Sequence, residues 1–191
     1  MHRRDGSETN LAAIFLGQMA PGEHVVQFYS DDNALLETLA GFVSGGLNAG
    51  ESAIVIAPAK RLRALGMRLA SSNVDLVGAM AEDRYITLEA DAALSSFMVD
   101  QWPNEALFGN LVERLFDRAS ANNRPVRAFG EMIAVLWARG QAPATVRLEY
   151  LWNRFRRKRM LSLLCAYPKA GFVDDPSRPL AEICAAHTIV I

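Results

Sequence analysis

The sequence is poor in cysteine, lacks a dominant charge and has no long apolar run. Only two of its 191 residues are cysteine, Cys165 and Cys184, which excludes a disulfide scaffold and is typical of a reducing compartment. The formal net charge is −1 at pH 7, which provides no general attraction to nucleic acid or to anionic lipid. No stretch reaches the roughly 18 apolar residues of a membrane span. We therefore expect a cytoplasmic protein that binds neither nucleic acid nor membranes.

What the chain does contain is typical of one globular domain. Hydrophobic residues make up 51% of the sequence and charged ones 21%, and the length suits a single well-packed unit. We find no internal repeat, low-complexity stretch or linker, and expect one domain over residues 21–191. Residues 1–20 form an N-terminal extension, whose apolar patch at 11–16 is too short for a signal peptide. We expect this extension to be a helix that docks on the domain.

Short apolar runs alternate with longer segments of helical period along the domain. The runs predict strands at 24–29, 52–57, 84–89, 125–129 and 160–167. Between them, Asp31 or Asp32 is expected to cap the first helix, Gly45 and Gly46 to end it, and Asn104 to cap the clearest one. A last helix is expected near 180–187. Since a strand–helix–strand order produces parallel pairing, we predict an α/β fold of three layers, with a mainly parallel central sheet and helices on both faces.

Six segments follow an order that resembles one known family. They are HVVQFYSDD from residue 24, GFVSGGLNAGESAIVIAP from 41, RAFGEM from 127, LEYLWNRF from 148, LLCAYP from 163 and EICAAHTIVI from 182. Together, over about residues 22–191, they resemble MEDS, the methanogen/methylotroph, DcmR-type sensory domain. The resemblance implies a degenerate RecA/KaiC-like core and a role in sensing small hydrocarbon-derived signals.

The resemblance also implies how such a domain passes on its state. MEDS domains occur alone or fused to transcription regulators and histidine kinases. No such segment accompanies the domain in this sequence, so we expect it to act on a separate histidine kinase or transcription regulator. We expect no catalytic residue and no cofactor, and a homo-oligomer stays possible.

One glycine-rich segment is close to a phosphate-binding loop. Residues 45–52, GGLNAGES, differ by one residue from the pattern G-x-x-x-x-G-K-[ST]. A phosphate loop follows a strand and opens a helix, whereas this segment follows a helix and precedes a strand. Glu51 also places an anion where the pattern has lysine, and the stretch after that strand, 57–61, contains no glycine. We therefore predict a core that lacks a P-loop.

The ends of the predicted strands indicate a small-molecule site. In a doubly wound sheet, ligands bind beyond the carboxyl ends of the strands. The residues there combine aromatic, carboxylate and cationic side chains, as such sites do: Tyr29, Asp31, Lys60, Arg61, Glu131 and Tyr167. Asp31 is equally suited to be a helix cap. Glu131 is the strongest candidate, because it ends a strand expected to be central and matches the acid of the family's G-E-M motif.

Arg127 lies inside a predicted buried strand, where a guanidinium needs a partner. Our first choice is Glu149. Glu149 and Asn153 are four residues apart on one predicted helix and so share a face. The pair is interpreted either as a structural ion pair or as part of a switch.

A metal site is only weakly indicated. Cys184 and His187 form a C-x-x-H pair, and His24 and Cys165 are the other candidate ligands. Structural zinc sites usually contain two such pairs. We therefore expect no bound metal.

These patterns favour a non-catalytic sensory or signal-relay domain that binds a small, largely apolar ligand near Tyr29, Glu131 and Tyr167. Two other functions stay open. In a nucleotide-binding switch or slow NTPase of the RecA/KaiC type, Lys60 or Arg61 would contact phosphate, and Glu131 would polarise water or hold a metal. In a ligand-free adaptor the cleft would be tightly filled, whereas a sensor would have an open pocket.

Overall fold

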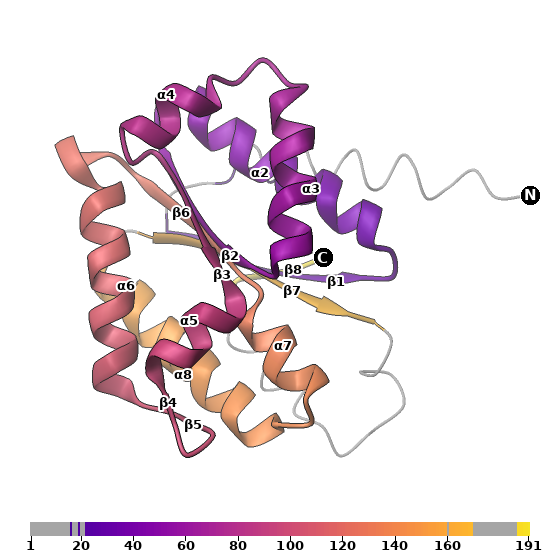
Figure 1. Cartoon of the computed structure of the whole chain (residues 1–191), viewed down its shortest axis with the longest axis vertical. Helices are drawn as coiled ribbons and strands as arrows, with labels where there is room; N and C mark the ends of the chain where they lie inside the picture. Colours follow the sequence, from indigo (N-terminus) through magenta and orange to yellow (C-terminus); the bar gives the residue numbers. More distant parts are fainter. Residues whose placement is uncertain (1–15, 17–18, 20–21, 160, 170–186) are drawn as a thin grey trace, which may run out of the picture.

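The centre of the molecule is a parallel β-sheet (Figure 1). The computed structural model describes residues 16, 19, 22–159, 161–169 and 187–191. Within them, six strands pair in the order β3-β2-β6-β7-β1-β8, and each of these pairings is parallel. The strands are β1 (His24–Tyr29), β2 (Ser52–Ala57), β3 (Tyr85–Glu89), β6 (Val126–Gly130), β7 (Leu161–Pro168) and β8 (Ile189–Val190).

The strand sequences explain why the sheet lies inside the protein. All six residues of β2, SAIVIA, and all five of β6, VRAFG, are buried. Near-continuous apolar runs are typical of parallel strands that are covered by helices on both sides. The sheet therefore separates two hydrophobic cores.

Helices cover both faces of the sheet (Figure 1). The layer we call the α2/α3 face contains α2 (Asp32–Asn48), α3 (Ala59–Ala70) and α4 (Leu76–Ala81); the α6/α8 face contains α5 (Ala90–Phe97), α6 (Glu105–Ala119), α7 (Met132–Ala138) and α8 (Ala142–Lys158). Successive strand residues point to opposite faces, so Ala128 packs on the α6/α8 face and Phe129 on the α2/α3 face. The predicted three-layer α/β fold is confirmed.

The helix starts follow their capping residues. The Asp31 carboxylate accepts a hydrogen bond from the Ala34 N–H at 3.3 Å, and the Asn104 side chain accepts one from the Leu107 N–H at 3.1 Å. Each of these side chains satisfies a backbone donor that the first helical turn leaves open. No described helix combines the length and the apolar character that a membrane span needs.

Several short elements were not predicted as separate units. They are α4, α5, the single turn of 3₁₀ helix Ala121–Asn123, the antiparallel hairpin of β4 (Met98–Val99) and β5 (Trp102–Pro103), and β8. Elements this short do not repeat often enough to show a clear period. Except for His187, the helix predicted near 180–187 lies outside the described residues. Of the extension 1–20, only Leu16 and Met19 are described, and both are buried on the α2/α3 face.

Gly45 and Gly46 do not end α2, which corrects one prediction. The helix continues to Asn48, and the positive φ of 81° comes at Gly50 instead. Gly46 serves another purpose: a Cβ atom built on it would lie 2.7 Å from Cδ and 2.8 Å from Nε of the buried Arg127 side chain. The glycine therefore allows Arg127 to pass directly beside the helix.

Replacing Gly46 with alanine is expected to destabilise the fold by about 1–3 kcal/mol, because the new methyl group overpacks a site that holds a buried guanidinium. A Cβ atom on Gly66, within α3, would have no heavy atom within 4 Å apart from those of its chain neighbours and of its own helix backbone. Gly66→Ala is therefore expected to stabilise by about 0.5–1 kcal/mol through helix propensity alone. Urea denaturation of both variants measures the difference, and equal midpoints would contradict this account of Gly46.

Candidate functional site

The sheet has a topological switch point between β2 and β6. These strands are neighbours, yet the helix that follows β2 lies on the α2/α3 face and the helix that follows β6 lies on the α6/α8 face. Open α/β sheets bind ligands beyond the carboxyl ends of strands at such points. The residues that follow these two strands therefore define the candidate site.

An ion pair connects the two sides of this switch point. Arg61 Nε donates to Glu131 Oε2 at 2.7 Å and Arg61 Nη2 donates to Glu131 Oε1 at 2.9 Å. Arg61 Nη2 also donates to Asp32 Oδ1, at 3.1 Å, at the start of α2. The Glu131 backbone N–H donates to the Ile56 carbonyl at 2.9 Å, which fixes this residue against β2. One guanidinium thus joins the ends of β2 and β6 to the first turn of α2.

Tyr29 completes this cluster from the end of β1. The Arg61 guanidinium carbon lies 5.7 Å from the centroid of the Tyr29 ring. Burial, and secondarily the charge of Glu131, raises the pKa of Tyr29 to about 12. Burial also raises the pKa of the Glu131 carboxyl, an effect that the hydrogen bonds from Arg61 oppose. We call Tyr29, Asp32, Arg61 and Glu131 the switch-point cluster.

An open pocket of about 230 Å³ lies beside this cluster, between the first turns of α2 and α3. Both charged and apolar side chains line it: Asp32, Asn33, Leu36, Pro58, Lys60, Arg61 and Ala64. Lys60 is thus part of the candidate site. Asp31 is absent from the lining residues of this pocket, and its carboxylate caps α2. The pocket is somewhat smaller than the usual 300–1,000 Å³ of drug-sized sites, so it suits a small molecule.

Tyr167 does not join the switch-point cluster. Its side chain is fully buried on the α6/α8 face, where it stacks on Phe28 with ring centroids 5.9 Å apart. Its hydroxyl donates a hydrogen bond to the Glu149 carboxylate. Tyr167 and Tyr29 point to opposite faces of the sheet, so one pocket cannot be lined by both.

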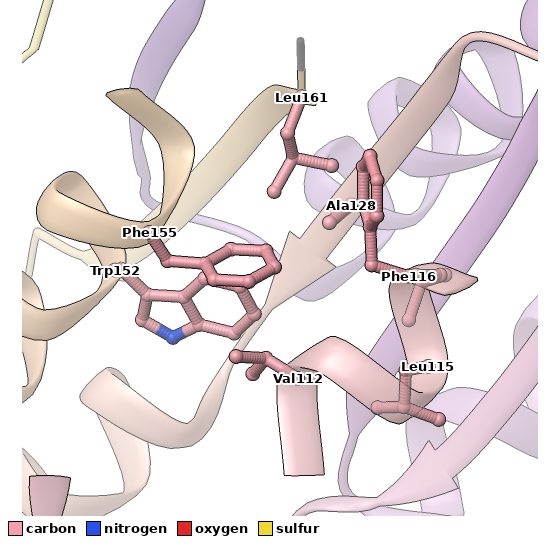
Figure 2. Close-up of a pocket in the computed structure, with 8 residues that line it drawn as sticks. Val112, Leu115, Phe116, Ala128, Trp152, Phe155 and Leu161 are labelled. Carbon is pink, nitrogen blue, oxygen red and sulfur yellow. The ribbon is translucent and has the colours of Figure 1, made fainter. Parts of the chain in front are cut away.

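An apolar hollow on the α6/α8 face is very small. It lies near the start of β7, where Trp152 and Phe155 of α8 approach Val112, Leu115 and Phe116 of α6 (Figure 2). Its volume is about 10 Å³, close to the space of one water molecule. A largely apolar ligand would fit there only if α6 and α8 moved apart.

The prediction that Glu149 is the partner of Arg127 was wrong. Arg127 Nε donates to the Glu51 carboxylate, and Nη1 donates to the Leu16 and Phe42 carbonyls at 2.9 and 3.2 Å. These groups lie on the α2/α3 face, whereas Glu149 is on α8 at the opposite face. Asn153, also on α8, accepts a hydrogen bond from Arg156 Nη2 at 3.0 Å instead.

Three of the weakly indicated metal ligands do come together. His24, Cys165 and His187 cluster with Glu149 on the α6/α8 face, with one potential ligand atom from each residue lying within 4.8 Å of the others. Cys184 lies outside the described residues. Burial raises the pKa of Glu149 to about 7 and the pKa of Cys165 well above its usual value.

The glycine-rich segment at 45–52 is not a phosphate-binding loop. It comprises the end of α2, a turn and the first residue of β2, and so lies at the amino ends of the strands. At the opposite edge, the described connections from strand to helix are Ser30-Asp31 after β1, Pro58 after β2 and Glu131 after β6. Within the described residues, none of these connections is glycine-rich.

Two residues of the charged network were missed by sequence reasoning. Asp32 was considered only as a cap, although its place one residue after Asp31 puts its side chain on the exposed start of α2, facing Arg61. Glu51 was considered only as a misfit to the phosphate-loop pattern. A charged residue just before a buried strand is a usable signal for pairing with the neighbouring strand.

The fold is similar to that of a solved structure. The solved structure of a KaiC-like protein from the hyperthermophilic archaeon Pyrococcus horikoshii aligns with a TM-score of 0.56 and 14% sequence identity. The alignment covers 80% of this chain and 64% of that one, so the chain spans slightly less than two thirds of that protein. The likeness shows a RecA/KaiC-like fold, as predicted.

The family follows from the sequence match. Residues 23–188 match MEDS, the MEthanogen/methylotroph, DcmR Sensory domain. This chain belongs to the MEDS family, and the predicted membership is confirmed; at the level of the family, its role is sensory. No curated protein shows detectable sequence similarity to the chain.

A double-mutant cycle distinguishes the two partners considered for Arg127. Glu51→Gln is expected to destabilise by about 3 kcal/mol, because it leaves a buried guanidinium without its carboxylate. Combined with Arg127→Met, it should show a coupling energy of about 1–3 kcal/mol, whereas Glu149→Gln with Arg127→Met should be additive within about 0.5 kcal/mol. Urea unfolding of the six proteins gives both values, and a larger coupling to Glu149 would contradict the assigned pair.

The Tyr29 phenol is expected to titrate near pH 12. Folding disfavours its ionised form, so this group contributes stability below about pH 10 that is lost as the pH rises toward 12. The absorbance titration of the wild type minus that of Tyr29→Phe isolates the phenol. Glu131→Gln should lower this pKa because it removes a nearby negative charge, while Glu113→Gln on α6 should leave it unchanged. A Tyr29 pKa near 10, or one insensitive to Glu131, would refute the cluster's electrostatics.

Proposed function

We propose that this MEDS domain is a sensor whose ligand binds in the pocket between α2 and α3 and rearranges the switch-point cluster. The ligand is a small molecule with an acceptor or anionic group that faces Arg61 and Lys60. Its apolar part packs on Leu36, Pro58 and Ala64, which line the same pocket. The ligand is therefore more polar at one end than the sequence-based expectation of a largely apolar compound.

The observation that carries this proposal is the uneven burial of the two carboxylates that pair with Arg61. The Glu131 side chain is only 6% exposed, whereas that of Asp32 is 66% exposed. Exposed ion pairs contribute little stability, so an incoming acceptor can replace Asp32 on Arg61 Nη2 while Glu131 keeps its two hydrogen bonds. The start of α2 is then released from α3.

Such a release is a suitable signal. A ligand shifts a conformational equilibrium only if it binds the two arrangements unequally, and loss of the Asp32 contact provides that inequality. The altered position of α2 would be recognised by a separate protein, for which a histidine kinase or a transcription regulator is the class that the family's domain combinations suggest. In this scheme the chain performs no catalysis.

A nucleotide-dependent switch is the main competing function. The KaiC-like fold supports it, and the two cations at the pocket could contact phosphate. Against it, Asp31, Asp32 and Glu131 surround the same edge of the sheet, and Arg61 is already paired with two carboxylates. The several negative charges of a nucleotide triphosphate would therefore be repelled there more strongly than the single charge of a small carboxylate ligand.

Calorimetric titration of the full chain tests these alternatives. The probes are ATP with magnesium and a panel of short-chain carboxylates and alcohols. Binding by a panel member is expected to weaken about 10-fold or more in Arg61→Met, since an exchangeable charge-assisted hydrogen bond contributes roughly 1.5–3 kcal/mol. Arg63→Met is the matched control, because Arg63 lies on the exposed side of the same helix.

The possible outcomes are distinct. Stoichiometric binding of ATP with magnesium would favour a nucleotide-dependent switch over the proposed sensor. If the wild type and Arg61→Met bind a panel member with equal affinity, the switch-point cluster is not part of the ligand-binding site. Absence of heat with every probe would favour a ligand-free adaptor.

A further inference from the structure

The second cluster of reactive side chains lies on the α6/α8 face, on the opposite side of the sheet from the pocket. It combines residues from four segments: His24 at the start of β1, Cys165 in β7, Glu149 in α8 and His187 just before β8. His24 and Cys165 point to this face because they alternate with Val25 and Leu164, which pack on the other. The fold thus brings together four side chains of types that can bind metal, from positions up to 163 residues apart (187 − 24).

The distances within the cluster are short. Cys165 Sγ lies 3.5 Å from His24 Nε2, His187 Nε2 lies 3.9 Å from Glu149 Oε1, and the two imidazole centroids are 3.9 Å apart. All four potential ligand atoms lie within 4.8 Å of one another. In a tetrahedral zinc site, bond lengths of about 2.0–2.3 Å place the ligand atoms about 3.3–3.8 Å apart. Closure around an ion requires only small side-chain movements.

The four side chains of the cluster are deeply buried. The side chains of His24, Cys165 and Glu149 are nearly inaccessible, and that of His187 is fully so. Glu149 Oε2 has no hydrogen-bond partner among the described residues, while its Oε1 accepts from the Tyr167 hydroxyl. A buried carboxylate oxygen without a partner is destabilising, and a cation is a chemically suitable partner.

We propose that His24, Glu149, Cys165 and His187 bind one Zn²⁺-type ion in a closed, four-coordinate site. Thiolate and imidazole ligands select zinc and related transition metals, whereas magnesium and calcium require oxygen ligands. The Tyr167 hydroxyl orients the Glu149 carboxylate, as outer-shell hydrogen bonds do in metal sites. Four protein ligands leave no open position, so the role is structural: the ion fastens the β8 end of the chain to β1, β7 and α8.

Cobalt titration tests this site without reference to any sensory activity. The untagged full chain is freed of metal with a chelator and titrated with Co²⁺, which reports thiolate ligation by charge-transfer absorption. We expect saturation at one ion per chain, competition by Zn²⁺, and a rise in the thermal midpoint when metal is added. Elemental analysis of the chain as purified is expected to find stoichiometric metal.

Variants assign the ligands. Cys165→Ser is expected to lose the charge-transfer band, and His24→Gln and Glu149→Gln to weaken binding by at least about 10- to 100-fold, the loss seen even for outer-shell partners. Glu113→Gln, on the neighbouring α6, is the control and should bind like the wild type. A folded wild-type chain without saturable Co²⁺ binding would overturn the proposal, as would an unchanged charge-transfer band in Cys165→Ser. The Co²⁺ titration of the wild-type chain needs no variant, so it can refute the proposal even if every variant misfolds.

Discussion

A parallel sheet that is covered on both faces gives the polar side chains within it no access to water, so each must find its partner inside the protein. Arg127 shows the consequence most clearly. Its guanidinium extends from β6 into the α2/α3 face and bonds to Glu51, to Phe42 of α2 and to Leu16 of the N-terminal extension. Gly46 leaves the space through which the side chain passes. One buried charge therefore determines the packing of three separate segments.

The same requirement has a different outcome at the edge of the sheet. Arg61 and Glu131 form a two-point pair across the switch point, but water reaches the third member, Asp32. The Arg127 side chain is only 2% exposed, so it cannot lose Glu51 without a large cost, whereas the 66% exposed Asp32 can leave Arg61. The adjustable charge network thus lies where the fold places ligands, and the permanent one lies at the opposite end of α2.

The two proposed sites divide the molecule by face. The pocket lies between α2 and α3, and the four-residue cluster lies beneath α8 on the other side of the sheet. A metal-bound α6/α8 face would form a rigid support against which α2 could move. Under these two proposals, the part of the domain that responds to a ligand would be separate from the part that holds the sheet together.

Much of the architecture was determined by local sequence. Apolar runs and helical periods identified β1, β2, β3, β6 and β7 and the long helices, because those patterns directly reflect burial on one or both faces. Since the carboxyl ends of parallel strands meet at one edge, the sequence also indicated that Tyr29, Arg61 and Glu131 belong together, and the structure places them in contact.

Tertiary structure alone decided which partners these residues have. Alternation along a strand tells that neighbouring residues face opposite ways, but not which helix covers which face, because that depends on strand order and on the path of each crossover. For this reason Glu149 was assigned to Arg127, although it pairs with Tyr167 across the sheet from it. The sequence named three members of the four-residue cluster but missed Glu149 for the same reason, since the members are brought together only when β1, β7, α8 and the segment before β8 pack side by side. The sequence by itself determined the main strands and long helices and their buried faces, and the packing of those faces decided the pairs, the pocket and the cluster.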